Sequence, residues 1–200
     1  MLRQGVAQLI EMEAGLRIVG QTGDGNEAIA MVHALNPDMI LLDLNMKGMS
    51  GIETLIEMRK QNITARIVIF SVSDNEEDVA SALREGADGY LLKDSEPEEL
   101  LPAIKQAAEG QQVFSPQLVQ VMAMALRSNA GNQNNTRPEL TPRETDILRL
   151  IAQGKTNKYI ARELNIVEST VKVHVKNLLK KLSLKSRVEA ALWAVKSGDI

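Results

Sequence analysis

Short, largely apolar runs alternate with amphipathic helical patterns through the first 125 residues, and this alternation restricts the fold more than any other feature. The apolar runs lie at 16–20, 39–42, 67–70 and 89–92. Strands that are covered on both faces have this composition and length. Helical patterns separate the runs, at about 2–13, 26–35, 51–60, 76–85 and 97–109. The alternation predicts an α/β domain with a parallel sheet and right-handed crossovers.

A second part of the chain has a different pattern. A further helix is predicted at about 116–126, and the polar residues that follow, with Gly, Pro and four Asn, have the composition of a linker. Beyond them we expect only helices, at about 142–153, 157–164, 168–182 and 186–197. Thr141 with Pro142 and Glu144 is typical of a helix start. We therefore divide the chain into domains at 1–125 and 140–200, joined by a linker at 126–139.

Charge is distributed unevenly along the chain. Residues 1–125 hold 9 basic and 19 acidic residues, a net −10, whereas residues 141–200 hold 12 basic and 6 acidic residues, a net +6. The whole chain carries a net charge of −3. The basic C-terminal part favours a polyanion as its partner, although neighbouring domains can also differ in charge without binding one.

Composition also disfavours several classes of site. The chain has no cysteine, which excludes disulfides, thiol catalysis and a thiolate metal site. It has no run of eighteen apolar residues, and its first residues lack the order of a secretory signal. These features together favour a protein of the cytoplasm without a membrane partner.

Three polar residues directly follow predicted strands. Asp43 follows the run at 39–42, Ser71 the run at 67–70 and Lys93 the run at 89–92. Ligands bind at the carboxyl ends of strands in an open parallel sheet. There an aspartate can take a phosphoryl group as an acyl phosphate, a hydroxyl can bond one of its oxygens, and an ammonium can offset its charge.

The stretches LLDLNM, FSVS and GADGYLLKD resemble the receiver domain of two-component response regulators, over most of residues 1–110. The resemblance implies a flavodoxin-like fold in which Asp43 is the phosphoacceptor. It also implies that Ser71 is the switch hydroxyl, Tyr90 the aromatic switch and Lys93 the lysine of the site. Phosphorylation would draw Ser71 inward, shift the loop after 67–70 and reorient Tyr90.

The family's first strand is missing from the sequence given. In the family that strand is central and ends in an acidic pair that holds Mg²⁺, and here no acidic residue precedes Glu11. Only Asp43 and the carbonyl of Asn45 remain as metal ligands, so we expect magnesium to be weak or absent. Our hypothesis is a natural protein longer by a strand and its loops, about 15 residues. The alternative is a short-form regulator that binds DNA without phosphorylation.

Residues 140–196 resemble the LuxR/FixJ-type helix-turn-helix almost without a break. Val171, Val175 and Leu178 recur at helical spacing on the inner face of its second helix, so the basic outer face is free for the major groove. Residues suited to base edges or phosphates are Lys172, Val173, Lys176, Lys180, Ser169, Thr170, Thr156, Asn157 and Lys158. The resemblance implies a homodimer on double-stranded DNA.

Within this family, DLNMKGMSG, GADGYLLKD and ESTVKVHVKNLLKK are most similar to the nitrate/nitrite response regulators, the NarL/NarP group. That resemblance implies nitrate or nitrite as the signal and a sensor histidine kinase as partner. Two other functions remain as alternatives. A phosphohydrolase acting through Asp43 is disfavoured, because such enzymes usually have an acid two residues on, where Asn45 stands. The other is an interaction module with a degenerate receiver.

Overall fold

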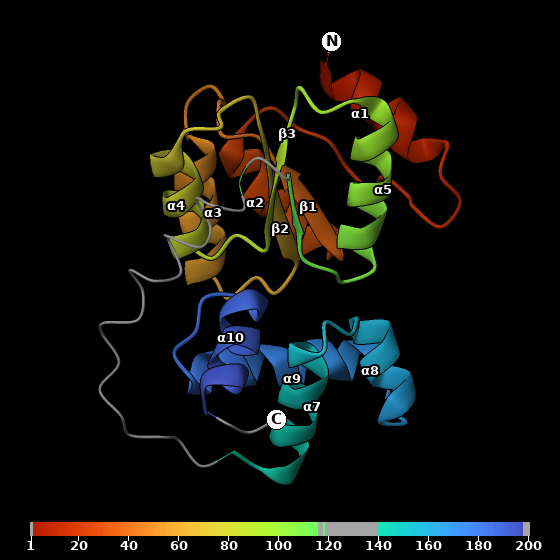
Figure 1. Cartoon of the computed structure of the whole chain (residues 1–200), viewed down its shortest axis with the longest axis vertical. Coiled ribbons are helices and arrows are strands. Elements are labelled where there is room, and N and C mark those ends of the chain that lie inside the picture. Colours follow the sequence, from red (N-terminus) through yellow and green to blue (C-terminus); the bar gives the residue numbers. More distant parts are fainter. Residues whose placement is uncertain (1, 116–117, 119–139, 198–200) are drawn as a thin grey trace.

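The computed structural model describes residues 2–115, 118 and 140–197 and has two parts (Figure 1). The predicted linker at 126–139, and all of the predicted helix at 116–126 except Leu118, lie outside these residues. In the first part, helices and strands alternate as α1 (Leu2–Glu11), α2 (Gly25–Leu35), β1 (Met39–Leu42), α3 (Gly51–Lys60), β2 (Arg66–Ser71), α4 (Glu76–Arg84), β3 (Gly89–Leu92), α5 (Pro97–Ala108) and β4 (Val113–Phe114). The second part contains α7 (Pro142–Ala152), α8 (Asn157–Glu163), α9 (Glu168–Lys181) and α10 (Arg187–Ser197).

The four strands form one parallel sheet in the order β1-β2-β3-β4. Leu42 lies opposite Ile69, and Phe70 lies opposite Leu91. The strands predicted at 39–42, 67–70 and 89–92 are confirmed. Strand β4 was not predicted, because its two residues are too few for any apolar periodicity.

The strand predicted at 16–20 is wrong. Residues 16–20 have no regular secondary structure, although they lie between two helices as a strand of this fold would. The reason lies in pairing, because a strand exists only beside another strand. The sheet begins at β1, which pairs with β2 alone, and a groove of about 1090 Å³ is lined by both β1 and the segment 15–23. The backbone of 16–20 therefore has no ladder to join within the described residues.

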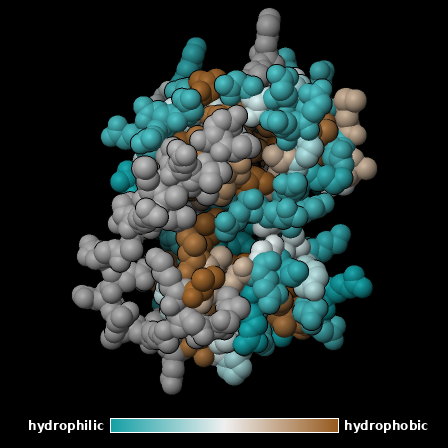
Figure 2. Space-filling view, viewed as in Figure 1, coloured by the Kyte–Doolittle hydropathy of each residue, from teal (hydrophilic) through white to brown (hydrophobic). Residues whose placement is uncertain are grey.

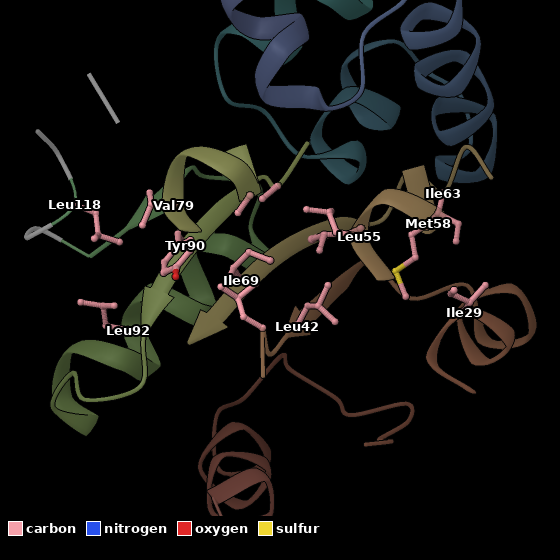
Figure 3. Close-up of a cluster of buried hydrophobic side chains, with 14 residues drawn as sticks. Ile29, Leu42, Leu55, Met58, Ile63, Ile69, Val79, Tyr90, Leu92 and Leu118 are labelled. Atoms are coloured by element: carbon pink, nitrogen blue, oxygen red, sulfur yellow. The ribbon is translucent and has the colours of Figure 1, made fainter. Parts of the chain in front are cut away.

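Helices cover both faces of the sheet (Figure 1). Strand β2 shows how alternate side chains reach opposite faces. Ile67 and Ile69 pack with α2, α3 and α4 in the cluster of Figure 3, whereas Val68 and Phe70 pack with α1 and α5. The core of this part is thus a sheet between two helical layers.

The second part has a separate core, built around Val171, Val175 and Leu178 of α9. Helix α7 begins with a capping box, in which Thr141 accepts a hydrogen bond from Glu144 N and Glu144 accepts one from Thr141 N. The predicted helix start and the inner face of the second helix are both confirmed. The turn between α8 and α9 contains Asn165 in a left-handed conformation with φ of 52°.

The surface is mostly polar. On the face shown in Figure 2, hydrophilic residues make up most of the described surface of both parts. No helix among the described residues combines the length and apolar character needed to span a bilayer.

Candidate functional site

Asp43 and Lys93 form an ion pair at the carboxyl end of the sheet. Lys93 Nζ donates to Asp43 Oδ2 at 2.5 Å, and Asn45 N donates to Asp43 Oδ1 at 3.0 Å. Gly51 allows the tight connection after β1, because a Cβ there would lie only 2.1 Å from the carbonyl oxygen of Asp43. The Asp43 side chain remains 34% exposed, so it is open to solvent.

Ser71 and Tyr90 are joined through the loop that follows β2. Ser71 is fully buried, and its hydroxyl accepts a hydrogen bond from Ser73 N at 3.1 Å. Tyr90 is also fully buried in the core cluster, where its hydroxyl donates to the carbonyl of Ser73 at 2.7 Å (Figure 3). Burial raises the pKa of Tyr90, and hydrogen bonds with Ser71 and Ser73 oppose that rise. The described hydrogen bonds thus connect Ser71 to this loop and not to Asp43.

Ser73 is a residue of this site that the sequence analysis missed. Its hydroxyl donates to Asp78 at 2.6 Å, in the first turn of α4, and accepts from Asn75 N. Ser73 therefore ties Tyr90 to the start of α4. The sequence signal was weak, because a serine two residues after a strand is ordinary loop composition.

The residues at this site fit a firmly held Mg²⁺ poorly. Magnesium prefers oxygen ligands, usually one or two carboxylates with waters and phosphate oxygens. In the described parts of the chain, no three acidic or histidine side chains are arranged so that they could hold a metal ion. At the carboxyl end of the sheet Asp43 is already paired with Lys93, which leaves the Asn45 carbonyl as the other predicted ligand.

The helices α8 and α9 form a helix-turn-helix whose outer face is polar. Of the residues predicted to meet DNA, Lys176 and Lys180 are exposed on α9, Val173 is 56% exposed, and Ser169 is exposed near its start. Thr170 is half-buried, and Lys158 is exposed on α8. Asn157 instead accepts a hydrogen bond from Arg187 at 2.8 Å. Most of this face can therefore approach a polyanion.

Lys172 of α9 is turned toward the first part of the chain. Its Nζ lies 2.8 Å from Asp38 Oδ1, just before β1, and its side chain is only 21% exposed. A second ion pair joins Lys185 to Glu85 at 3.0 Å. The two parts also meet at Gly110, where a Cβ would lie 2.8 Å from Thr156 Cγ2 and φ is +95°. The amino-terminal end of the sheet thus contacts the helix-turn-helix.

A buried ion pair stands at that same end of the sheet. Arg59 lies at 2.7 Å from Asp88, and their side chains are only 7% and 2% exposed. Arg59 also donates to the carbonyls of Gly86, Ile63 and Ala65. The sequence analysis missed this pair, because 29 residues separate its two members. In the sequence, both residues look like ordinary surface charges.

A parallel α/β domain with an aspartate and a lysine paired at its carboxyl edge, followed by a helix-turn-helix, defines a class of switchable DNA-binding regulators. Residues 1–105 match the family model described as "Response regulator receiver domain". Residues 138–194 match the model described as "Bacterial regulatory proteins, luxR family". The chain therefore belongs to the LuxR family of two-component response regulators, which are DNA-binding transcription regulators.

Named relatives agree with this assignment. The chain is 58% identical to the "Nitrate/nitrite response regulator protein NarL" of Escherichia coli K12, over 96% of this chain and 89% of the relative. It is 49% identical to NarP of the same organism, over 96% and 88%. The resemblance to the NarL/NarP group is confirmed. A LuxR-family response regulator from Aurantimonas sp. SI85-9A1 matches at 32% identity with a TM-score of 0.58, over 63% of this chain and 90% of that structure.

Proposed function

We propose that this chain is a cytoplasmic transcription regulator that responds to nitrate or nitrite through phosphorylation of Asp43. In this proposal the receiver domain spans residues 1–125, the linker 126–139 and the DNA-binding domain 140–200. The relatives NarL and NarP are nitrate/nitrite response regulators, which supports nitrate or nitrite as the signal. The observation that carries the proposal is the Asp43–Lys93 pair, in one chain with a helix-turn-helix that has exposed lysines.

A sensor histidine kinase supplies the phosphoryl group. A carboxylate oxygen of Asp43 attacks phosphorus, a P–O bond forms, and the bond from phosphorus to the kinase histidine breaks. Lys93 then exchanges its contact with Asp43 for one with a phosphoryl oxygen, since its ammonium already lies at 2.5 Å. Mg²⁺ would assist at Asp43 and Asn45, and the sparse ligand set makes this contribution weak.

Ser71 and Tyr90 carry the change away from Asp43. When the hydroxyl of Ser71 turns to a phosphoryl oxygen, it gives up the amide of Ser73. Ser73 holds both Tyr90 and Asp78, so the loop and the first turn of α4 must rearrange together. Helix α4 ends at Arg84, and Lys185 of the DNA-binding domain donates to the Arg84 carbonyl and to the side chain of the next residue, Glu85. This is a continuous route from the phosphoacceptor to the domain contact.

DNA binding uses the outer face of α9. Lys172 and Lys176, one turn apart, reach base edges, and Val173 contacts a thymine methyl group. Lys180, Ser169, Thr170, Asn157 and Lys158 contact phosphates. Because Lys172 is paired with Asp38 in this arrangement, the two domains must separate before α9 can enter the major groove. A homodimer then reads two half-sites.

The alternatives are less well supported. A short-form regulator that needs no phosphorylation is not favoured, because the relatives that cover nearly the whole chain are response regulators. A phosphohydrolase is disfavoured by Asn45, and a bare interaction module leaves the lysines of α9 without a role.

Footprinting on a nitrate-regulated promoter, with and without acetyl phosphate, tests the proposal. We expect a protected operator whose occupancy rises when Asp43 is phosphorylated, and no such rise with Asp43→Ala. Lys176→Ala should lose the footprint while the chain remains folded, and Lys60→Ala, which removes an exposed lysine of the receiver part, is the control. An unchanged footprint with Lys176→Ala would refute the DNA-binding assignment. Phosphorylation of Asp43 by acetyl phosphate should be slow in this 200-residue chain, because Asp43 and Asn45 alone hold Mg²⁺ weakly.

A further inference from the structure

Three arginines gather around one carboxylate where the two domains meet. Arg59 at the end of α3, Arg66 at the start of β2 and Arg187 at the start of α10 line the same groove as Asp88. Asp88 is 2% exposed, and its charge acts on both Arg66 and Arg187. We call these four residues the interdomain arginine cluster. The carboxylate of Glu189 also acts on Arg59, so three positive charges meet two negative ones and the net charge is +1.

The hydrogen bonds of the cluster leave one donor, Arg66 Nε, and one acceptor, Asp88 Oδ1, without a partner among the described residues. Arg59 donates to three carbonyls and to Asp88, and Arg187 donates to Asn157 and to the carbonyl of Lys155. Arg66 donates from one Nη to the carbonyl of Gln111 at 2.7 Å. Its Nε is buried and has no partner within the described residues. A buried donor on a charged group without an acceptor is destabilising and calls for a partner.

The charges of the cluster also repel each other. Burial, and then the guanidinium of Arg66, lowers the pKa of Arg187 to about 10, and Asp88 only partly opposes this. Burial likewise lowers the pKa of Arg66, and Arg59 lowers it further. Guanidinium groups taken from water without enough negative charge are costly, and a bound anion would offset that cost.

We propose that the interdomain arginine cluster binds a small tetrahedral oxyanion, such as inorganic sulfate or phosphate, between Arg66 and Arg187. The planar guanidinium group presents paired donors that match the oxygens of such an anion. The free Nε of Arg66 supplies one of these donors. Since Arg66 belongs to the receiver and Arg187 to the DNA-binding domain, the anion links the two domains at the point where they already touch.

Calorimetric titration of sodium sulfate into the full chain tests this proposal, with sodium chloride at equal ionic strength as reference. We expect one saturable site for sulfate and none for chloride. Arg66→Gln and Arg187→Gln should each weaken sulfate binding by about tenfold or more, because each removes charge-assisted hydrogen bonds. Arg149→Gln is the matched control, since Arg149 is 51% exposed on α7, and it should bind sulfate as the parent chain does.

The parent chain decides the question even if one variant fails to fold. Absence of a saturable sulfate signal would overturn the proposal and leave ordered water as the partner of Arg66 Nε and Asp88 Oδ1. Equal weakening by Arg149→Gln would also overturn it, because general screening would then explain the effect. Loss with Arg66→Gln or Arg187→Gln, but not with Arg149→Gln, supports it.

Discussion

Two ion pairs stand at opposite ends of the same sheet. At the amino-terminal end, Arg59 and Asp88 are 7% and 2% exposed, and Arg59 makes four hydrogen bonds. At the carboxyl end, Lys93 and Asp43 are 12% and 34% exposed, and Lys93 donates to Asp43. A buried pair whose partner cannot return to water is structural, whereas an exposed carboxylate held by one flexible ammonium can exchange its partner. Position and burial therefore separate the structural pair, Arg59 with Asp88, from the pair that we propose to be reactive, Asp43 with Lys93.

The largest expected effect is at the structural pair. Arg59→Ala leaves Asp88 buried without its ion pair and frees three carbonyls, so the free energy of unfolding should fall by about 3–5 kcal/mol. Urea unfolding followed by circular dichroism measures it. The control is Lys60→Ala, on the next residue, whose 4.0 Å pair with Glu57 is exposed and should contribute less than about 1 kcal/mol. If Arg59→Ala and Lys60→Ala lowered the free energy of unfolding equally, the Arg59–Asp88 pair would be no more structural than an exposed ion pair.

The reactive pair could be predicted from the sequence and the structural pair could not. Asp43 and Lys93 each follow an apolar run directly, and parallel strands bring their carboxyl ends together. Arg59 and Asp88 meet only because α3 and the turn before β3 pack side by side, and no sequence periodicity reports such a contact. The contact of Lys172 with Asp38 is of the same kind, because it depends on how two domains rest on each other.

The secondary structure divides in a similar way. The helix starting at Thr141 was predictable because its capping box is local in sequence. The strand predicted at 16–20 was wrong because its composition fitted a strand, whereas its existence depends on a neighbour elsewhere in the chain. Structure that depends on neighbouring residues could therefore be predicted from the sequence, and pairing between distant residues could not.

The next effect concerns an ion pair inside the DNA-binding domain. The hydrogen bond from Lys181, and then that from Thr141, holds the pKa of Glu144 below its ordinary value of 4.5. A lowered folded-state pKa contributes stability that is present above pH 4.5 and is lost as the pH falls through the folded-state value. Glu144→Gln should therefore cost about 1 kcal/mol at neutral pH, and this cost should shrink as the pH falls below 4.5. Fluorescence of Trp193, which packs in this core, follows the unfolding. A difference that stayed constant down to pH 3 would contradict the assignment.

A smaller change in stability is expected at the reactive pair. Lys93→Ala should alter the free energy of unfolding by less than about 1 kcal/mol, since Asp43 stays partly in water. It should nevertheless abolish the gain in DNA affinity produced by acetyl phosphate. Lys105→Ala on α5, which breaks the partly exposed pair of Lys105 with Glu13, is the matched control and should keep that gain. A large loss of stability with Lys93→Ala would place this pair in the same class as Arg59 and Asp88.

The smallest effect on stability, and the most direct test of the domain contact, is at Asp38. Its side chain is 75% exposed, so Asp38→Ala should change the free energy of unfolding by less than about 0.5 kcal/mol. Releasing Lys172 should raise DNA affinity by up to about fivefold, the equivalent of a surface ion pair of about 1 kcal/mol. Fluorescence anisotropy with operator DNA measures the change. Glu98→Ala removes the same charge from an exposed position on α5. If Asp38→Ala raises DNA affinity more than Glu98→Ala does, the additional rise comes from the ion pair itself. That additional rise in DNA affinity should shrink as salt is added, because exposed charges are screened. A rise that does not depend on salt would mean that packing, and not charge, holds α9 against the receiver.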